Sequence, residues 1–508
     1  MTHDAVGLAS LVERREVTAT ELLEAAIARS EAVNPRIFAI VIPMFDIARA
    51  RARSQPGGPF GGVPFLIKDL FQDYAGVPAT AGCAAWRRAG YVPREHSEIV
   101  RRWLSAGTVI FGRTCTPEFG AKGITEPAIW EATRNPWHLD RSPGGSSGGA
   151  AAAVAAGIVP VAGASDGGGS IRIPASATGL FGLKPGRGRT PSGPTVGEAM
   201  HGAAINHVIS RSVRDSAGML DATQGTECGS SAKIERPERP YSEEAVRDPR
   251  RLRIAFSARS PLGTDVDPAV VAAVDSTARL LTALGHEVEP AEPDIDGVAL
   301  MHDFLTVWFA HAALQVKTSQ ETLRARPTDF ELDTLAMAAI GNSKSAVDYA
   351  RSYVRWVEYG RKLSEFLETY DVYMTPTLAE PPPRIGSVKT PEWASRVVRA
   401  AVALGLSRVI PLATGTIERA ALENLRPVPF TQLANVTGVP AMSVPLYTFP
   451  DGLPLGIHFL ADHGAEGKLF ALAGQLERAA SWHLRRPRLE ASPNTLSQAS
   501  PSEFSLQP

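Results

Sequence analysis

Hydrophobic and polar residues along this chain form two patterns, one typical of buried strands and one typical of helices. Residues 63–67 are a continuous apolar run, which predicts a buried strand that leads directly into Lys68. A capping box at 18–21 predicts a helix to about residue 33, where Asn34-Pro35 would end it. Both kinds of element are therefore expected in the first seventy residues.

The rest of the chain continues this mixture without a linker that would divide it. We expect one domain over residues 1–487, with a polar connector at 224–250 and a largely helical region at 298–370. The tail at 488–508 is rich in Ser, Pro, Asn and Gln, which predicts disorder. The remaining predicted elements are strands at 252–256 and 286–288, a helix at about 268–284, strands and turns at 427–446 and 453–460, and a helix at about 467–480.

Two glycine–serine clusters, at 143–149 and 165–172, indicate a site for acyl chemistry. Their serines Ser146 and Ser170 are 24 positions apart. Glycine adopts backbone conformations that let several N–H groups converge, and such groups stabilise the negative oxygen of a tetrahedral intermediate. The candidate oxyanion hole is the backbone of Gly167, Gly168, Gly169 and Ser170. An alanine-rich run after Gly149 predicts a helix starting near Ser147.

Lys68 is the candidate base for a serine nucleophile. A serine must pass its proton to a neighbouring group, and lysine can accept it only when burial makes the neutral amine available. The chain has nine lysines among 52 basic residues, so a lysine at this position is informative. A structural role remains open, in which Lys68 pairs with Asp69 or ends the strand.

Two other classes of protein, α/β-hydrolases and proteins with a phosphate-binding loop, match the glycine–serine clusters less well. Gly144-x-Ser146-x-Gly148 matches a nucleophile elbow, but 135–143 is not the apolar strand that an α/β-hydrolase requires before it. A phosphate-binding loop would need a Gly-Lys-Ser/Thr ending, which the cluster lacks.

Four segments together resemble the amidase signature family: the apolar-Lys-Asp setting of Lys68, the cluster at 144–149, residues 165–175 and residues 179–185. The resemblance extends over nearly the whole chain. It implies an α/β fold with one large mixed β-sheet covered by helices on both faces. Core motifs would lie at 60–215, a variable helical pocket region at about 298–425 and a C-terminal return to the family pattern at 427–482.

The resemblance also implies a role for each candidate residue. Ser170 would be the nucleophile, Ser146 the bridging serine after a cis peptide bond, and Lys68 the base. Amides would be hydrolysed through an acyl-enzyme without a metal or another cofactor. Three further residues are expected to support this triad: Ser147, whose hydroxyl would join the network or cap a helix, and Asp166 and Arg172, which would hold the turn.

Substrate preference is the least determined feature. Residues 166–175 and 186–189 are closer to stand-alone amidases acting on nylon oligomers such as the 6-aminohexanoate cyclic dimer, on anilides or on carbamates. The alternative is the glutaminase-type subunit of a tRNA-dependent amidotransferase. Phe304 and Trp308 share one face of a predicted helix with His311, either as ordinary core or as an aromatic wall for an uncharged group.

The composition of the chain limits the classes of molecule that the protein is expected to bind. A net charge of −1 with 21% charged residues argues against a nucleic-acid binder. Three cysteines without metal-binding spacing, and a start without a signal-peptide pattern, predict a cytoplasmic protein. The longest apolar run, 150–164, is too short to span a bilayer. We therefore expect a small amide or carbamate substrate, no membrane partner and a possible homodimer.

Overall fold

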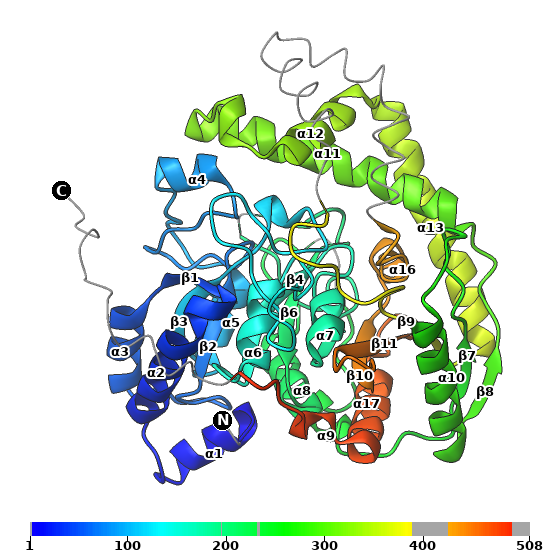
Figure 1. Ribbon diagram of the computed structural model, residues 1–508, viewed down its shortest axis with the longest axis horizontal. Coiled ribbons are helices and arrows are strands. Elements are labelled where there is room, and N and C mark those ends of the chain that lie inside the picture. The colour runs from blue at the N-terminus through cyan, green and yellow to red at the C-terminus, as the bar shows by residue number, and fades with distance from the viewer. Residues whose placement is uncertain (1–2, 195, 231–233, 389–424, 490–508) are drawn as a thin grey trace.

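The computed structural model describes residues 3–194, 196–230, 234–388 and 425–489 and has one mixed sheet of eleven strands at its centre (Figure 1). The strand order is β1-β3-β2-β4-β6-β5-β10-β11-β9-β7-β8. Parallel pairs join β2 to β3 and β4, and β7 to β8 and β9, and the other neighbours are antiparallel. The strands are β1 Ile40–Pro43, β2 Pro64–Lys68, β3 Val109–Thr114, β4 Val161–Asp166, β5 Phe181–Lys184, β6 Ile205–Ser210, β7 Arg253–Phe256, β8 Glu287–Pro290, β9 Val372–Pro376, β10 Ala441–Thr448 and β11 Pro454–Leu460.

Helices cover both faces of this sheet. On β2, Phe65 and Ile67 pack with residues of α1 and α5, whereas Leu66 packs with residues of α2 and α6. Successive strand side chains point to opposite faces, so these helices lie on opposite sides. The predicted α/β class is confirmed. The helices in the described ranges are α1 Ala5–Glu13, α2 Ala19–Ile37, α3 Phe45–Arg53, α4 Ala84–Ala89, α5 Glu98–Ser105, α6 Gly148–Ala155, α7 Arg172–Thr178, α8 Val213–Thr223, α9 Tyr241–Glu244, α10 Pro268–Ala283, α11 Gly297–Leu323, α12 Leu332–Ser343, α13 Ala346–Thr369, α16 Gln432–Thr437 and α17 Glu466–Ala480.

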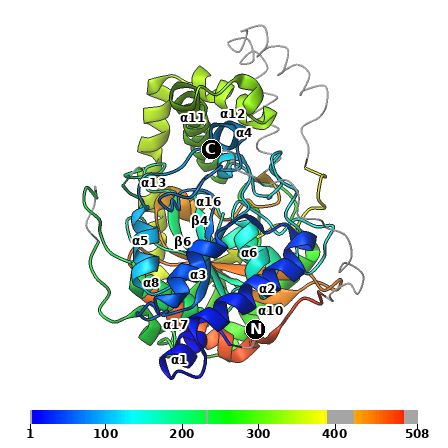
Figure 2. The same cartoon turned by 90° about the vertical axis from the view of Figure 1, so that its left-hand side faces the viewer.

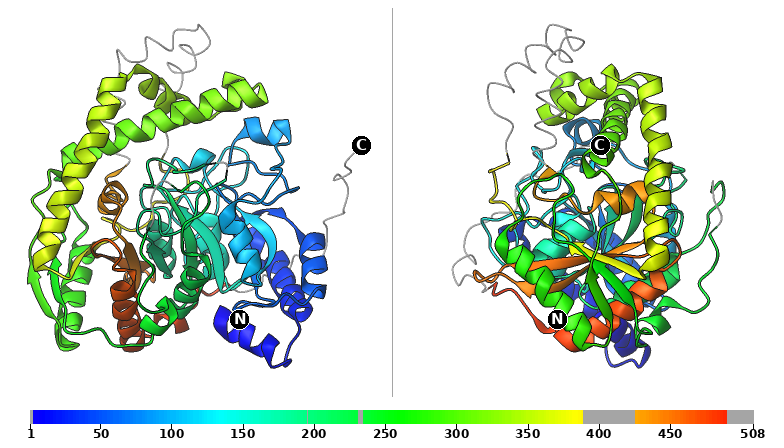
Figure 3. Two further views of the ribbon diagram at one scale, coloured as in Figure 1. Left: turned by 180° about the vertical axis from the view of Figure 1, so that it is seen from behind. Right: turned by 90° about the vertical axis from the view of Figure 1, so that its right-hand side faces the viewer.

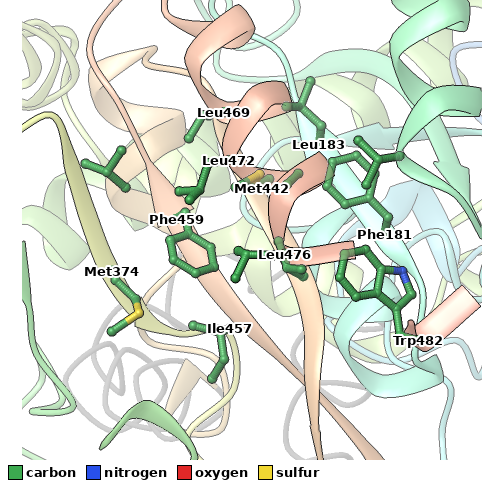
Figure 4. Close-up of a cluster of buried hydrophobic side chains, with 14 of the residues drawn as sticks. Phe181, Leu183, Met374, Met442, Ile457, Phe459, Leu469, Leu472, Leu476 and Trp482 are labelled. Carbon is green, nitrogen blue, oxygen red and sulfur yellow. The ribbon is translucent and has the colours of Figure 1, made fainter. Parts of the chain in front are cut away.

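The largest group of buried apolar side chains lies between the middle of the sheet and α17. Phe181 and Leu183 from β5 meet Ile457 and Phe459 from β11 (Figure 4). Leucines from one face of α17 close this layer together with Trp482, which is 1% exposed. A buried layer of this size provides a rigid support for the loops at the strand ends.

The helices α11 and α12 lie above the strand ends, and α13 runs from them down beside the sheet, where Leu363 and Leu367 pack with residues of β7 and β9 (Figures 2 and 3). The helix α11 packs against α12, α13, α4 and α16. Of the described helices, α11 alone is long and apolar enough to cross a membrane, with a mean hydropathy of 1.3 over its most apolar window. However, 56% of that window is buried in the fold. Core helices pass the same test of length and composition, so the observation is weak evidence for a membrane span.

Two predictions of local structure need correction. The capping box at Thr18 is present, but α2 continues past Pro35 to Ile37. The side chain of Asn34 accepts N–H groups from Ala39 and Ile40, which stabilises an exit later than the proline. Residues 427–446 contain α16 as well as a strand, which the pattern of apolar residues did not indicate. The predicted tail from 490 onward lies outside the described residues.

Candidate active site

Lys68 lies at the carboxyl end of β2, beside the end of its parallel neighbour β4. Its side chain is completely buried, and Nζ is 2.7 Å from Oγ of Ser146 and 2.9 Å from Oγ of Ser165. Burial lowers the pKa of Lys68 to about 7, although the negative charge of Asp166 acts in the opposite direction. A substantial fraction of this amine is therefore neutral at ordinary pH.

The alternative role for Lys68, an ion pair with Asp69, is wrong. The carboxylate of Asp69 accepts hydrogen bonds from the backbone N–H of Thr80 and from its hydroxyl. Its nearest cation is Arg113, at 3.9 Å. Lys68 is thus directed at the serines instead of at a carboxylate.

Ser146 and Ser147 lie between the lysine and the second glycine cluster. The peptide bond between Gly145 and Ser146 is cis, as the family resemblance implied. The hydroxyl of Ser147 donates to the carbonyl of Ser165 at 3.1 Å and accepts the N–H of Ser165 at 3.3 Å. Ser147 occupies the N-cap position of α6 without a side-chain cap bond. Its side chain therefore joins the cluster to β4 and does not cap the helix.

The turn that carries Ser170 is organised by Asp166. This buried carboxylate accepts the N–H groups of Gly169 at 2.7 Å and Ile171 at 3.1 Å. The guanidinium of Arg172 donates to both of its oxygens at 2.9 Å. Burial alone would raise the pKa of Asp166, but the charge and hydrogen bonds of Arg172 outweigh it and hold that pKa well below its usual value. Asp166 therefore stays ionised and holds the turn closed.

One N–H group of the predicted oxyanion hole already has an acceptor within the protein. The N–H of Gly169 donates to the carboxylate of Asp166 at 2.7 Å. In the described part of the chain, the N–H groups of Gly167, Gly168 and Ser170 donate to no protein acceptor. Three unpaired N–H groups in one turn beside a serine match what a developing oxyanion requires.

Glycine is required at two positions of this turn. Gly169 has a φ of +126°, and a Cβ there would lie 2.3 Å from Oγ1 of Thr431. A Cβ on Gly168 would lie 2.9 Å from the ring of Phe304. The turn is therefore packed from two sides, by α11 and by the residue preceding α16.

Ser170, for which the motifs predict the role of nucleophile, is 8% exposed. Among the described residues, the hydrogen bonds that start at Lys68 reach Ser146 but do not extend to the hydroxyl of Ser170. Such contacts in an active site without substrate are often long and shorten when the substrate binds. The structure therefore joins Lys68 to Ser146 and places Ser170 next to Ser147, whose N–H donates to the carbonyl of Ser170 at 3.3 Å.

Three buried residues of the site were missed by the motif analysis. Ser165 is the second hydroxyl at Lys68. Thr431 donates through Oγ1 to the carbonyl of Gly168 at 2.7 Å. Asn435 donates to the carboxylate of Asp166 at 2.9 Å and accepts from Arg172 at 2.6 Å. Thr431 and Asn435 lie in the region 427–482, which resembles the family. That resemblance is the sequence feature that could have pointed to these two residues.

The predicted aromatic wall lies at the turn. Phe304 is 3% exposed, Trp308 is half-buried, and their ring centroids are 5.3 Å apart. A methyl group on Gly167 would lie 3.5 Å from the indole of Trp308. His311 points to a different group, where it faces His201 with ring centroids 6.2 Å apart. Phe304 and Trp308 are therefore both core residues and neighbours of the candidate oxyanion hole.

A small pocket opens beside Ser165 and the end of β4. Its lining contains no charged side chain. In the described ranges, no group of three or more His, Cys, Asp or Glu residues could hold a metal ion. The pocket is lined by Phe71, Ser165, Ser192, Val196, Ala199, Ala204, Ile205 and Asn206.

This combination of a two-sided mixed sheet with a buried lysine and two serine turns defines a class of enzyme. A family model described as Amidase matches residues 21–470, so the chain belongs to the amidase signature family, as its motifs predict. The protein is a hydrolase that acts on amide C–N bonds.

Three comparisons show which members of the family the chain is similar to. The 6-aminohexanoate-cyclic-dimer hydrolase of Pseudomonas sp. strain NK87 is 37% identical over 504 residues, covering 96% of this chain and 97% of that one. A solved structure of a 6-aminohexanoate cyclic dimer hydrolase complexed with substrate has a TM-score of 0.87 and 36% identity, over 96% of this chain and 98% of that one. A bacterial aryl acylamidase of the same family, 24% identical, shares the fold with a TM-score of 0.80 over 95% and 98%.

Proposed function

We propose that this protein hydrolyses uncharged amides through an acyl-enzyme on Ser170, with Ser146 and Lys68 as its proton relay. The observation that carries the proposal is the contact of 2.7 Å between Ser146 and a fully buried lysine whose pKa is lowered to about 7. A neutral amine in that position can accept a proton, whereas an ammonium cannot.

In the acylation step, Lys68 takes a proton from Ser146 while Ser146 takes one from Ser170. The oxygen of Ser170 attacks the carbonyl carbon and forms a tetrahedral intermediate. The same relay returns one proton to the departing nitrogen, which leaves as an amine. Water then repeats the sequence on the ester, releasing the acid and restoring Ser170.

The intermediate's negative oxygen would be held by the N–H groups of Gly167, Gly168 and Ser170. Donors of this kind act in a water-poor site, and losing one typically costs about 10²–10³ in turnover. Asp166 and Arg172 do not touch the reacting atoms in this scheme. They keep the turn in the conformation that leaves those N–H groups unpaired, and Ser147 fastens the first cluster to β4.

Substrates are proposed to be uncharged and partly apolar. Support comes from the uncharged lining of the pocket beside Ser165 and from the rings of Phe304 and Trp308 at the turn. The relative named for the 6-aminohexanoate cyclic dimer acts on an amide without a charged end. Cyclic and linear oligoamides, anilides and esters are therefore proposed substrates. Carbamates would react more slowly, because both heteroatoms donate electrons to the carbonyl.

A turnover panel tests the proposal. Purified protein is assayed for kcat/KM on a neutral anilide, its ester and carbamate analogues, a cyclic oligoamide and glutamine. We expect the neutral anilide and the cyclic amide to exceed glutamine by more than tenfold, because charged ends find no counter-charge in the pocket. A preference for glutamine would reject the uncharged-substrate proposal and favour the glutaminase-type alternative.

A further inference from the structure

The long helix α13 has two apolar faces on opposite sides. Its inner face packs against α11 and α16 and buries Trp356, Tyr359 and Leu363. On the opposite side, Val347, Val354 and Val357 are 63%, 59% and 69% exposed. A surface helix normally buries one apolar face and exposes a polar one, so the second face requires a separate explanation.

These exposed residues form a continuous strip, which we call the valine stripe: Val347, Ala350, Val354 and Val357. Their spacings of three and four residues place them on one side of the helix. The stripe extends over the eleven residues from Val347 to Val357, a rise of about 15 Å along the helix. Leu314 of α11, which is 55% exposed, lines a cavity with Ala346 and extends the apolar surface at the start of α13.

The helix α13 lies along the outer edge of the molecule (Figures 1 and 3). Single exposed apolar residues are ordinary, but a contiguous strip on one element marks an interaction surface. Four of the ten large apolar side chains that are exposed in the described part of the chain lie on α13, when Tyr353 is counted with the three valines. The concentration on one helix therefore indicates a partner that is itself elongated and apolar.

Charges beside the stripe identify the partner. Arg351 and Glu358 flank it on the same side, seven residues apart. Arg351 lies 4.0 Å from Asp348, and Glu358 forms no ion pair with another described residue. In an antiparallel pair of identical helices, Arg351 would face Glu358 of the partner subunit, and the two-fold axis would repeat the contact. A parallel pair would instead place like charges together.

We propose that this chain forms a two-fold symmetric dimer through antiparallel pairing of α13 with α13 of a second copy. The axis lies midway between Arg351 and Glu358, close to Val354. The interface is small, because three turns of one helix bury less than the roughly 800 Å² per partner of a typical stable complex. The dimer is therefore weak and reversible, with a fraction that rises with concentration. This inference is independent of the proposed catalytic mechanism.

Sedimentation velocity over a wide range of protein concentration tests the dimer. Arg351→Glu and Glu358→Arg should each weaken dimerisation about tenfold, since each brings two like-charge contacts to the interface. The double variant should recover the wild-type dissociation constant, because the exchanged charges are again complementary. Val354→Lys should abolish the dimer, and Arg14→Glu, at the C-terminal cap of the distant α1, should leave it unchanged.

Amide hydrolysis per subunit, measured at high dilution, shows that each variant is folded. A protein that stays monomeric at the highest concentration would overturn the proposal. So would a dimer that tolerates both single charge reversals, or a monomer in which residues 389–424 crosslink to the valine stripe. Loss of dimerisation in the single variants with recovery in the double variant supports it.

Discussion

The titration of Lys68 is the most direct consequence of the site's geometry. At the ordinary lysine pKa of about 10.5, roughly 0.03% of the amine is neutral at pH 7. With the pKa lowered to about 7 by burial, half of it is neutral. The environment of Lys68 therefore raises the concentration of usable base on the order of 10³-fold at this pH.

The protonation state of the Lys68 amine determines whether kcat/KM rises or falls with pH. The active form is the neutral amine, so kcat/KM should fall about tenfold per pH unit below pH 7 and level off above pH 8. Lys68→Arg keeps the charge but supplies no base, and it should lose about 10²–10⁴ in kcat/KM. The assay is release of the amine from a neutral anilide between pH 5.5 and 9, with circular dichroism to confirm folding at each pH.

A matched control exists in the same core. Lys184 is also fully buried, and burial together with the charge of Arg172 lowers its pKa to about 7. Its Nζ donates to the carbonyl of Pro185 and does not contact the serines. Lys184→Met should therefore keep the acid limb of the pH profile, whatever its effect on stability. A profile that is flat down to pH 5.5, or an arginine variant of Lys68 with more than a tenth of wild-type activity, would refute the reasoning.

Three further outcomes are expected. A fluorophosphonate should add once, at Ser170, by intact-mass and peptide mapping, and Ser170→Ala should lose several orders of magnitude in kcat; an adduct on another serine would contradict the assignment. Gly169→Ala should destabilise the turn and lower kcat by more than tenfold, because its Cβ would lie 2.3 Å from Thr431; unchanged melting temperature and kcat would disprove this packing argument. Phe304→Ala and Trp308→Ala should each raise KM for anilides about tenfold while an acetamide-sized substrate changes less, and equal losses on both substrates would show a purely structural role.

The local elements were predictable because their causes are local. The capping box that starts α2 and the apolar run of β2 act through neighbours within a few residues, and both elements form where expected. The end of α2 was misplaced because Asn34 finds partners beyond Pro35, a contact that depends on the path of the chain after the helix. The helix α16 was not predicted for the same reason, because local sequence does not show which distant contacts a segment will make.

In the candidate site, too, some features could be predicted from the local sequence and others depend on contacts between distant residues. The order of residues is enough to name the side chains that could react, because only a few residue types can attack a carbonyl or lose a proton near neutral pH, and it shows glycines where a tight turn needs them. Which of these groups have free hydrogen-bonding capacity depends on the folded structure. Asn435 reaches Asp166 across 269 positions of sequence, and Asp166 in turn accepts the N–H of Gly169, one of the four groups of the predicted oxyanion hole. The fold also removes Lys68 from water and so lowers its pKa. Desolvation and competition for hydrogen bonds depend on neighbours that are distant along the chain.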